Sequence, residues 1–406
     1  MTTLAAQTET FRKTPALLLL ALLVTLPQIG ETIYTPSLTD MARGLNISAS
    51  AAQTTLSIFF AGFALGVLCW GQVSDHIGRR KTMIITLALY LLGCLICLSA
   101  SSLLVLNSGR FIQAFGAASC SVVIQSVCRE AFSGERRVVV FTTIGMLIPV
   151  SAAAGPFIGG LSVTLGDWRT AFMVLLVLGA VSLVLVCAAF PETLVKQNHK
   201  ASLMQILARM LRDPQVIGTG LLIGIGNGII FSFYAEAPFL LINMQGLSAV
   251  TYGTLCMLVV SGSIWGGMAM RRLNTAGYTG QTVMIVGILL LACAAAGLLV
   301  VSLLTTGQLY LVLFTGFSVL LFAGFTLLTT ACLHGALQHY HDALGTAGAL
   351  LGLFYYAVIT ALTEGMALLH SGSVLVFPTY ALGLSMAAAL IFFALIYKAK
   401  VAAPKA

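Results

Sequence analysis

The chain has 406 residues, of which 59% are hydrophobic and 8% are charged, and its mean hydropathy is +1.02. Soluble globular domains carry about 25% charged residues, so this composition excludes an ordinary soluble protein and predicts an all-α membrane protein. The apolar segments are continuous and do not alternate with a period of two, which argues against a membrane-spanning β-barrel.

Twelve apolar segments are long enough to cross a bilayer as helices, since one crossing takes about 20 residues. All Lys and Arg residues except Arg43, Arg110 and Arg169 fall in the N-terminus, in alternate loops and in the C-terminus. Basic residues gathered in this way are typical of cytoplasmic segments. We therefore expect a multi-pass membrane protein with both termini in the cytoplasm and no nucleic-acid partner. The expected spans are residues 15–38, 52–73, 82–101, 103–127, 138–163, 168–190, 215–242, 250–270, 280–302, 308–332, 343–369 and 373–397.

The first span contains an acidic residue, Glu31, in the sequence Gly30-Glu31-Thr32-Ile33-Tyr34-Thr35-Pro36. An ionisable residue inside a membrane costs about 2.5–3.5 kcal/mol on insertion scales and is a functional candidate by default. Pro27 and Pro36 can bend the helix on either side of it. Burial favours the neutral form of a carboxyl group, so we expect Glu31 to exchange a proton and, when ionised, to attract a cationic group. The alternative is a structural Glu31 hydrogen-bonded to neighbouring helices.

The connection between the second and third spans reads Gly71-Gln72-Val73-Ser74-Asp75-His76-Ile77-Gly78-Arg79-Arg80-Lys81, one of the few densely charged stretches of the chain. Its charge places it on the cytoplasmic side. Its glycines allow a sharp turn, and Asp75 and Arg79 can form an ion pair between helices. We expect a moving part at this position.

The fourth and fifth spans contain further unusual residues. Arg110 in the fourth span needs backbone carbonyls or a carboxylate as partners, and it can either anchor the first or fifth span or take part in proton transfer. The fifth span contains Gly155-Pro156-Phe157-Ile158-Gly159-Gly160. Its proline breaks a helix hydrogen bond, and its small residues allow close helix approach. We expect a bend at Gly155, Pro156 and Gly159, with a generic glycine-rich packing face as the alternative.

The longest connection, residues 191–214, divides the chain into an expected N-terminal half (1–190) and C-terminal half (215–406). Within it, apolar residues recur at helical spacing after a possible cap at Ser202, flanked by Lys200, Arg209 and Arg212. We expect a short amphipathic helix on the inner membrane surface, and a free linker is the alternative. The apolar residues are Leu203, Ile206, Leu207, Met210 and Leu211.

The seventh and eleventh spans carry Glu236 and Glu364 close to their expected outer ends. We expect both side chains to be solvated at the mouth of a vestibule, and Glu236 also to steer substrate. Aromatic residues in these spans and in the first span can line an adaptable cavity, or they can face lipid and pack between helices. These residues are Tyr34, Phe231, Tyr234, Phe354 and Tyr355.

The Cys and His residues do not indicate a metal site. The nine Cys residues lie inside or at the ends of expected spans, without the repeated Cys-x-x-Cys spacing of metal ligands. His334, His339 and His341 fall in a short inner loop, where solvated side chains are the simpler interpretation. The chain contains no protease, esterase or nucleotide-binding motif. We therefore expect no metal, no cofactor and no enzymatic activity.

Three of these stretches resemble the shared motifs of the twelve-span drug–proton antiporters of the major facilitator superfamily. They are the segment from Gly71 to Lys81, the pattern Arg110-x-x-Gln113-x-x-Gly116, and the segment from Gly145 to Gly160. The stretch from Gly30 to Pro36 and the sequence Ala237-Pro238-Phe239-Leu240 are similar to segments of the Bcr/CflA subfamily, in which an Asp commonly precedes the Tyr of the first span. Here Glu31 replaces that Asp.

The resemblance implies a major facilitator fold with twelve transmembrane helices in two six-helix halves, placed in a bacterial inner membrane. It implies that Asp75 and Arg79 latch the cytoplasmic side in the outward-facing state, with Asp75 near the N-terminal end of the eleventh span at Leu344–Thr346. Glu31 would carry the proton and Arg110 would couple it to the first span. The residues of the implied latch are Gly71, Asp75, Gly78, Arg79, Arg80, Arg129 and Glu130.

The sequence thus leads us to expect a monomeric, proton-coupled secondary transporter that exports small, partly hydrophobic compounds by alternating access. Two alternatives remain open. One is a proton-coupled uptake permease for a specific metabolite such as a nucleoside, and the other is a non-transporting membrane receptor or scaffold. The residues expected to contact substrate are Glu31, Tyr34, Phe231, Tyr234, Glu236, Phe354 and Tyr355.

Overall fold

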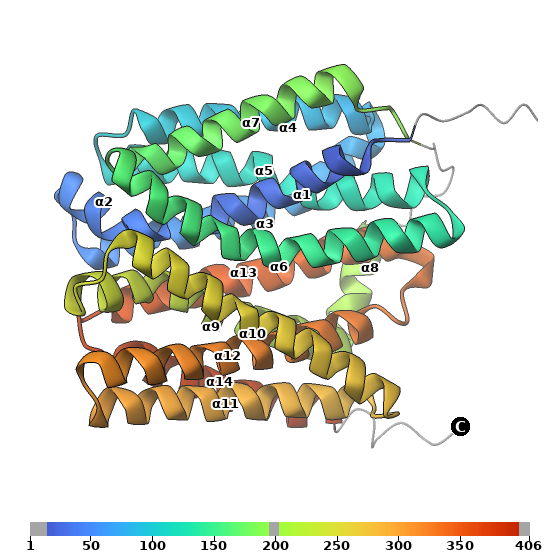
Figure 1. Ribbon diagram of the computed structural model, residues 1–406. Coiled ribbons are helices and arrows are strands. Elements are labelled where there is room, and N and C mark those ends of the chain that lie inside the picture. Colours follow the sequence, from blue (N-terminus) through green and yellow to red (C-terminus); the bar gives the residue numbers. More distant parts are fainter. Residues whose placement is uncertain (1–13, 195–202, 398–406) are drawn as a thin grey trace, which may run out of the picture.

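The computed structural model describes residues 14–194 and 203–397, and within them it contains twelve helices long and apolar enough to cross a membrane. The predicted all-α membrane fold is therefore confirmed (Figure 1). The helices are α1 (Leu17–Thr32), η1 (Thr35–Ser37), α2 (Leu38–Gly44), α3 (Ala49–Ile77), α4 (Arg79–Leu98), α5 (Leu103–Ala131), α6 (Gly134–Leu165), α7 (Arg169–Ala189), α8 (Leu203–Met210), α9 (Pro214–Pro238), η2 (Phe239–Met244), α10 (Ala249–Thr275), α11 (Gly280–Leu304), α12 (Gly307–Ala336), η3 (His341–Ala343), α13 (Leu344–Leu369), α14 (Val376–Ile391) and η4 (Phe392–Tyr397).

Short polar side chains set the starting points of several long helices. A side-chain oxygen just before a helix satisfies one of the first backbone N–H groups, which have no partner within the helix. Such capping hydrogen bonds begin α3, α5, α9, α10 and α11. The capping residues are Ser48, Ser102, Asp213, Ser248 and Thr279.

Buried apolar side chains form two large clusters, one mainly from α1–α7 and the other from α9–α14. We call these two sets the N-terminal helices and the C-terminal helices. They meet chiefly where α3 packs along α13 and where α6 packs along α10. Figure 1 shows α6 and α10 side by side at the α2 end of the bundle and diverging toward the α8 end.

The connection between the second and third spans is shorter than the sequence indicated. Helix α3 continues to Ile77 and α4 begins at Arg79, so that Gly78 alone separates them. Gly78 has a φ of 100°, a conformation that residues with a Cβ atom rarely adopt. The charged stretch therefore consists of two helix ends joined by a single-residue turn.

Helix α8 lies in the connection between the two sets of helices. Its Ile206 and Met210 are buried against Tyr340, Ala343 and residues of α13, whereas Met204 is exposed. The apolar side of the helix thus packs partly on the protein. The cap expected at Ser202 and the flanking Lys200 lie outside the described residues.

Candidate functional site

A cavity of about 270 Å³ lies between the N-terminal and the C-terminal helices. Its walls come from α1 and α6 on one side and from α9, α10 and α12 on the other. We call it the central cavity. Its lining combines aromatic, aliphatic and uncharged polar side chains with a single carboxyl group: Gln28, Glu31, Thr32, Gly145, Ile148, Pro149, Ala152, Asn227, Ile230, Phe231, Tyr234, Val260, Ser263, Phe322, Phe325, Thr326, Thr329 and Thr330.

Glu31 is that carboxyl group, and its side chain is only 3% exposed. It lies in the last turn of α1, which contains Pro27 and ends at Thr32, before the short helix that begins at Thr35. Its Oε1 atom is buried without a hydrogen-bond partner, and no cation forms an ion pair with it among the described residues. A buried carboxylate that lacks partners is unstable, so this group favours either a bound proton or a cation in the cavity.

Arg110 of α5 is completely buried and binds α1 next to Glu31. Its Nη1 atom donates hydrogen bonds to the carbonyl oxygen of Gly30, at 3.1 Å, and to Oε1 of Gln113, at 2.7 Å. Its guanidinium carbon lies 4.0 Å from the ring centroid of Tyr34 and 4.3 Å from that of Phe59. Arg110 thus bonds to a backbone carbonyl of the first span and stacks on aromatic rings, which stabilise a buried cation.

The glycines of α6 bring that helix against the turn that carries Glu31. A Cβ atom at Gly155 would collide with the side chain of Thr32, and one at Gly159 would overlap the carbonyl oxygen of Ile33. Thr32 also donates to the carbonyl oxygens of Gln28, at 3.1 Å, and of Ala152, at 3.4 Å. The glycine-rich segment around Pro156 therefore fixes the position of α1 beside the cavity.

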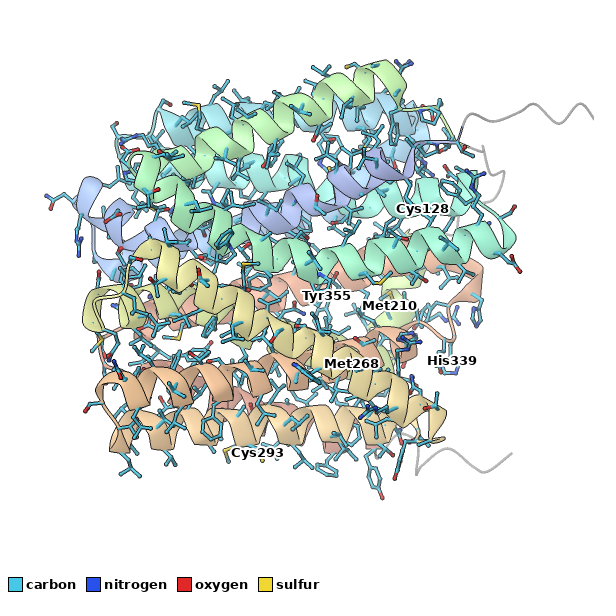
Figure 2. All side chains as sticks on the ribbon, viewed as in Figure 1. Cys128, Met210, Met268, Cys293, His339 and Tyr355 are labelled. Carbon is cyan, nitrogen blue, oxygen red and sulfur yellow. The ribbon has the colours of Figure 1, made fainter. Side chains whose placement is uncertain are left out.

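The predicted substrate residues are not all in one place. Phe231 and Tyr234 line the central cavity together with Glu31. Tyr34 is buried beneath Arg110, and Phe354 packs against Gly220 of α9. Tyr355 lies at the contact between the two sets of helices (Figure 2), where it lines a second cavity of about 240 Å³ toward the α8 end.

The expectation that Glu236 is solvated is wrong, whereas Glu364 is only partly exposed. Glu236 is fully buried and accepts hydrogen bonds from Gln53, at 2.6 Å, and from His370, at 2.8 Å. Glu364 is partly buried and accepts a hydrogen bond of 2.5 Å from Ser57. Helix α3 presents Gln53 and Ser57 one turn apart, so both carboxylates find partners across the contact between the two sets of helices.

Several polar residues of the central cavity were not predicted. Thr326, Thr329 and Thr330 place hydroxyl groups along one face of α12, and Asn227 adds an amide from α9. The signal in the sequence is the recurrence of threonines at helical spacing inside an apolar span. Hydroxyls are weak indicators, because a threonine in a helix can bond to its own backbone.

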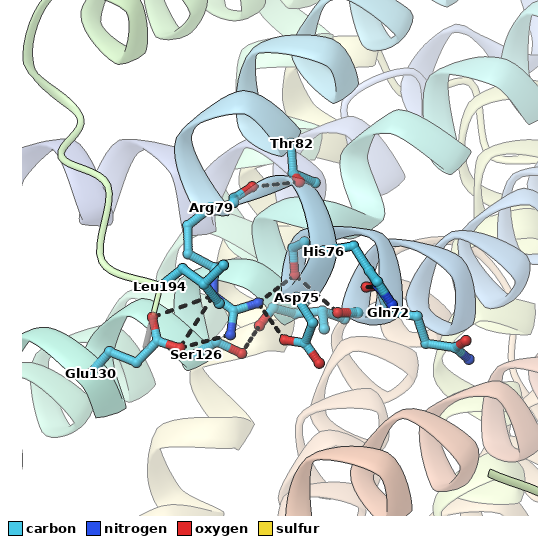
Figure 3. A network of polar contacts seen from close by, with 12 residues as sticks. Gln72, Asp75, His76, Arg79, Thr82, Ser126, Glu130 and Leu194 are labelled. Atoms are coloured by element: carbon cyan, nitrogen blue, oxygen red, sulfur yellow. Dashed lines mark hydrogen bonds and ion pairs between the residues drawn. The ribbon is translucent and has the colours of Figure 1, made fainter. Parts of the chain in front are cut away.

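The charged turn at Gly78 forms a compact cluster of polar contacts at the α8 end, shown in Figure 3. Arg79 is 5% exposed, and its Nη atoms lie 2.7 Å from a carboxylate oxygen of Asp75 and 2.7 Å from one of Glu130. Thr193 donates to Glu130 at 2.8 Å, and Glu192 accepts from the backbone N–H of Arg79 at 2.9 Å. These contacts join α3, α4, α5 and the end of α7.

The other residues of the implied latch lie around this cluster. Arg80 donates to the carbonyl oxygen of Cys187 at 2.6 Å, and Gly71 lies close to Val122 of α5. The side chain of Arg129 lines the second cavity, together with Leu344 and Gly345 from the start of α13. The placement of Asp75 against that helix end stays a prediction.

Comparison with known proteins assigns the fold to a large family. Residues 20–363 match the profile of the Major Facilitator Superfamily. An uncharacterized transporter of Rickettsia bellii is 32% identical over 398 residues, which cover 96% of this chain and 98% of that protein. The crystal structure of a POT family transporter superposes with a TM-score of 0.77 at 13% identity, covering 95% of this chain and 96% of that one, which shows the fold alone.

Two further relatives have descriptive names. Multidrug resistance protein D of Escherichia coli is 28% identical over 345 residues, 84% of this chain and 85% of that protein. The bicyclomycin resistance protein homolog of Haemophilus influenzae is 25% identical over 346 residues, 84% of this chain and 86% of that protein. Both cover most of the described helices.

Proposed function

Because the chain belongs to the major facilitator superfamily, we propose that this secondary transporter exports small, partly hydrophobic compounds in exchange for protons. The central cavity is the proposed binding site, and alternating access to its two ends moves the substrate. The observation that carries the proposal is Glu31, a buried carboxyl group that faces the cavity without an ion-pair partner among the described residues.

The chemistry follows from the two protonation states of Glu31. As a carboxylate, it attracts a cationic or hydrogen-bond-donating substrate into the cavity. A proton that enters neutralises the carboxylate, which removes this attraction and releases the substrate. For an uncharged substrate, exchange against one proton moves one net charge, which at a membrane potential of about 100 mV contributes about 2.3 kcal/mol and can drive accumulation by tens of fold. For a monovalent cation the same exchange moves no net charge, and the proton concentration gradient alone drives it.

The lining and the relatives support a partly hydrophobic substrate. Phe231, Tyr234, Phe322 and Phe325 line the cavity together with Glu31, and aromatic rings bind both apolar and cationic ligands. The multidrug and bicyclomycin resistance proteins align with 84% of this chain. Arg110 would position the turn of α1 that carries Glu31.

Movement would occur between residues 1–190 and residues 215–406, connected by residues 191–214. The cluster of Asp75, Arg79 and Glu130 would rigidify one end of the N-terminal half and engage α13 in the outward-facing state. In this proposal the α8 end faces the cytoplasm of a bacterial cell, both termini are cytoplasmic, and the monomer is the transporting unit.

The polar part of the cavity favours a second candidate, uptake of a specific polar metabolite such as a nucleoside. Gln28, Asn227 and the three threonines of α12 offer hydrogen bonds that a purely hydrophobic drug would leave unused. A transporter for one metabolite would bind that compound alone, whereas an exporter of the proposed kind would bind several unrelated ones.

Proton release separates these possibilities. Detergent-purified wild-type protein and the Glu31→Gln variant are mixed, in weakly buffered solution, with a panel of drugs, dyes and metabolites. Release of about one proton on binding by the wild type, and none by the variant, supports exchange at Glu31 and identifies the ligand class. Ligand binding with equal release in both proteins would contradict the role of Glu31.

A further inference from the structure

A second buried carboxyl group joins the two sets of helices at the α2 end. Glu236 of α9 accepts from Nε2 of Gln53, on α3, at 2.6 Å. Nδ1 of His370, which follows α13, lies 3.0 and 2.8 Å from its two carboxylate oxygens and 3.2 Å from Nε2 of Gln53. Gln53 belongs to the N-terminal helices, whereas Glu236 and His370 belong to the C-terminal helices, so the carboxylate is the shared acceptor of a contact between them.

The charge of Glu236 is essential to this arrangement. Hydrogen bonds to an ionised group are roughly twice as strong as those between neutral groups, and Glu236 is fully buried, so it has no water to replace a lost partner. His370 can donate from Nδ1 both as a neutral ring and as an imidazolium. A proton on the carboxylate therefore weakens both bonds, while a proton on the imidazole leaves its bond in place.

One polar atom in this contact lacks a hydrogen-bond partner. Gln53 is fully buried and its Oε1 atom has no hydrogen-bond partner, which is unfavourable for a buried acceptor. The contact between α3 and α9 thus depends on the charge-assisted bond from the same side chain. Loss of that charge weakens the bond of Gln53 to Glu236 and leaves Gln53 with its longer contact to Nδ1 of His370, at 3.2 Å.

Few other ionisable groups surround Glu236 at this end. The segments packed against α9 contribute Tyr34 before η1, Asp40 and Arg43 from α2, Glu364 from α13, His370 directly after α13, Tyr310 from α12 and Tyr380 from α14. Arg43 bonds to Asp40 and to Asn243, Glu364 accepts from Ser57, and Tyr380 donates to the carbonyl oxygen of Leu362. His370, with a side chain 11% exposed, is the ionisable partner of Glu236.

We propose that Glu236 is a second proton-binding site, separate from Glu31, and that a proton bound there opens the α2 end. A hydronium ion reaching the α2 end transfers its proton to the Glu236 carboxylate and leaves as water. The neutral acid then holds Gln53 weakly, and α3 separates from α9 and α13. The proposal rests on the alternating access of the proposed function, but not on Glu31 or on the direction of transport.

Hydrogen–deuterium exchange of the full-length protein in nanodiscs, read by mass spectrometry, tests this proposal. Exchange is measured between about pH 8 and about pH 5 and corrected for the intrinsic effect of pH. In the wild type, peptides that contain Gln53, Glu236 and His370 should exchange roughly tenfold faster at the acid end, because one charge-assisted hydrogen bond changes an opening equilibrium by about that factor. Glu236→Gln, which mimics the protonated acid, should exchange fast throughout.

Glu364→Gln is the matched control, because it neutralises another carboxyl group that binds α3 at the same end. It should keep the pH response, as should Glu31→Gln. A wild type whose exchange does not depend on pH, or a Glu236→Gln variant that retains the wild-type response, would overturn the proposal.

A second variant keeps the test independent of whether Glu236→Gln folds. Gln53→Ala leaves the contact between Glu236 and His370 in place and removes the contacts of Gln53 with both residues, so its α2 end should exchange fast at every pH. If Gln53→Ala exchanges as slowly as the wild type, the proposed role of the Gln53–Glu236 contact in closing the α2 end is contradicted. If the wild-type protein releases no proton on binding drugs but its hydrogen–deuterium exchange still depends on pH, the proposed export function is contradicted. The proposed role of Glu236 is then still supported.

Discussion

Single side chains carry most of the proposed chemistry, and their surroundings differ sharply. Glu31 faces a cavity with an unpaired oxygen atom, whereas Glu236 has partners from two other segments. At Glu31, substrate and proton can compete for the same carboxylate. At Glu236, a bound proton would weaken the hydrogen bond that joins α9 to α3. Two glutamates in one membrane domain can thereby serve substrate exchange and gating separately.

Shortening Glu31 tests whether its carboxyl chemistry or its length matters. Glu31→Asp keeps an ionisable group, so we expect ligand-induced proton release of wild-type stoichiometry. The retracted carboxylate should weaken binding of a cationic ligand by roughly tenfold, the effect of losing about 1.4 kcal/mol. Titration of ligand affinity and of released protons on one sample checks both statements, and absence of release from Glu31→Asp would contradict them.

The substitution Arg110→Lys tests whether a guanidinium group stacked on aromatic rings is needed beside α1. Lysine keeps the charge, but it loses the planar guanidinium that stacks on Tyr34 and Phe59. Its ammonium group also differs in position from the Nη1 atom that donates to Gly30 and Gln113. We expect Arg110→Lys to lower the free energy of unfolding by about 2–3 kcal/mol, since hydrogen bonds of a buried charged group are lost. Thermal unfolding measures this change. The control Arg43→Lys, at a side chain 72% exposed, should change stability by less than about 0.5 kcal/mol.

At the level of helices, α6 holds α1 through backbone proximity and not through a specific side-chain bond. Gly155 and Gly159 let α6 approach Thr32 and Ile33, immediately after Glu31. Small residues at helix contacts are the usual means of close packing in membranes. The position of Glu31, the proposed proton-exchanging residue, therefore depends on glycines that have no side-chain chemistry of their own.

A methyl group at Gly159 should disturb this contact. The Cβ atom of Gly159→Ala would overlap the carbonyl oxygen of Ile33, so α6 must move away, and we expect a loss of stability of about 1–3 kcal/mol together with weaker ligand binding. Gly316→Ala is the matched control, because no atom lies within 4 Å of its Cβ position, and it should be neutral or slightly stabilising. Equal thermal stability of the two variants would contradict the close-packing role.

Hydropathy predicted where the spans lie but not where the helices end. The third span was expected from residue 82, yet α4 begins at Arg79, because Glu192 accepts hydrogen bonds from its first backbone N–H groups. Charged residues at a helix end lower the local hydropathy without breaking the helix. Glu192 is 113 residues away from Arg79 in the sequence, so it cannot be identified as the partner from the local sequence.

The same limit explains the wrong expectation for Glu236. Glu31 was found from the sequence because a lone carboxyl group in an apolar span is costly wherever its partners are. Glu236 was placed in solvent because its partner Gln53 lies 183 residues away. Pairing across the two sets of helices depends on the packing of α3 against α9 and α13, which no local pattern reveals.

At the scale of the whole molecule, the two ends of the bundle are joined differently. At the α2 end the two sets of helices are connected by the bonds of Glu236 and Glu364 and by the close approach of Gly253 to Pro156. Toward the α8 end, the second cavity separates α3 and α5 from α12 and α13. If the α8 end is cytoplasmic, this arrangement is closed to the outside.

Labelling of introduced cysteines determines which end is which. Ser126 lines the second cavity at the α8 end, and Asp167 lies exposed before α7 at the α2 end. With the expected topology, a membrane-impermeant maleimide should label Ser126→Cys only in inside-out vesicles and Asp167→Cys only in intact cells, above the background of the native Cys residues. The two variants control each other, since an inverted protein would exchange their labelling patterns. That result would reverse the side from which a proton reaches Glu236.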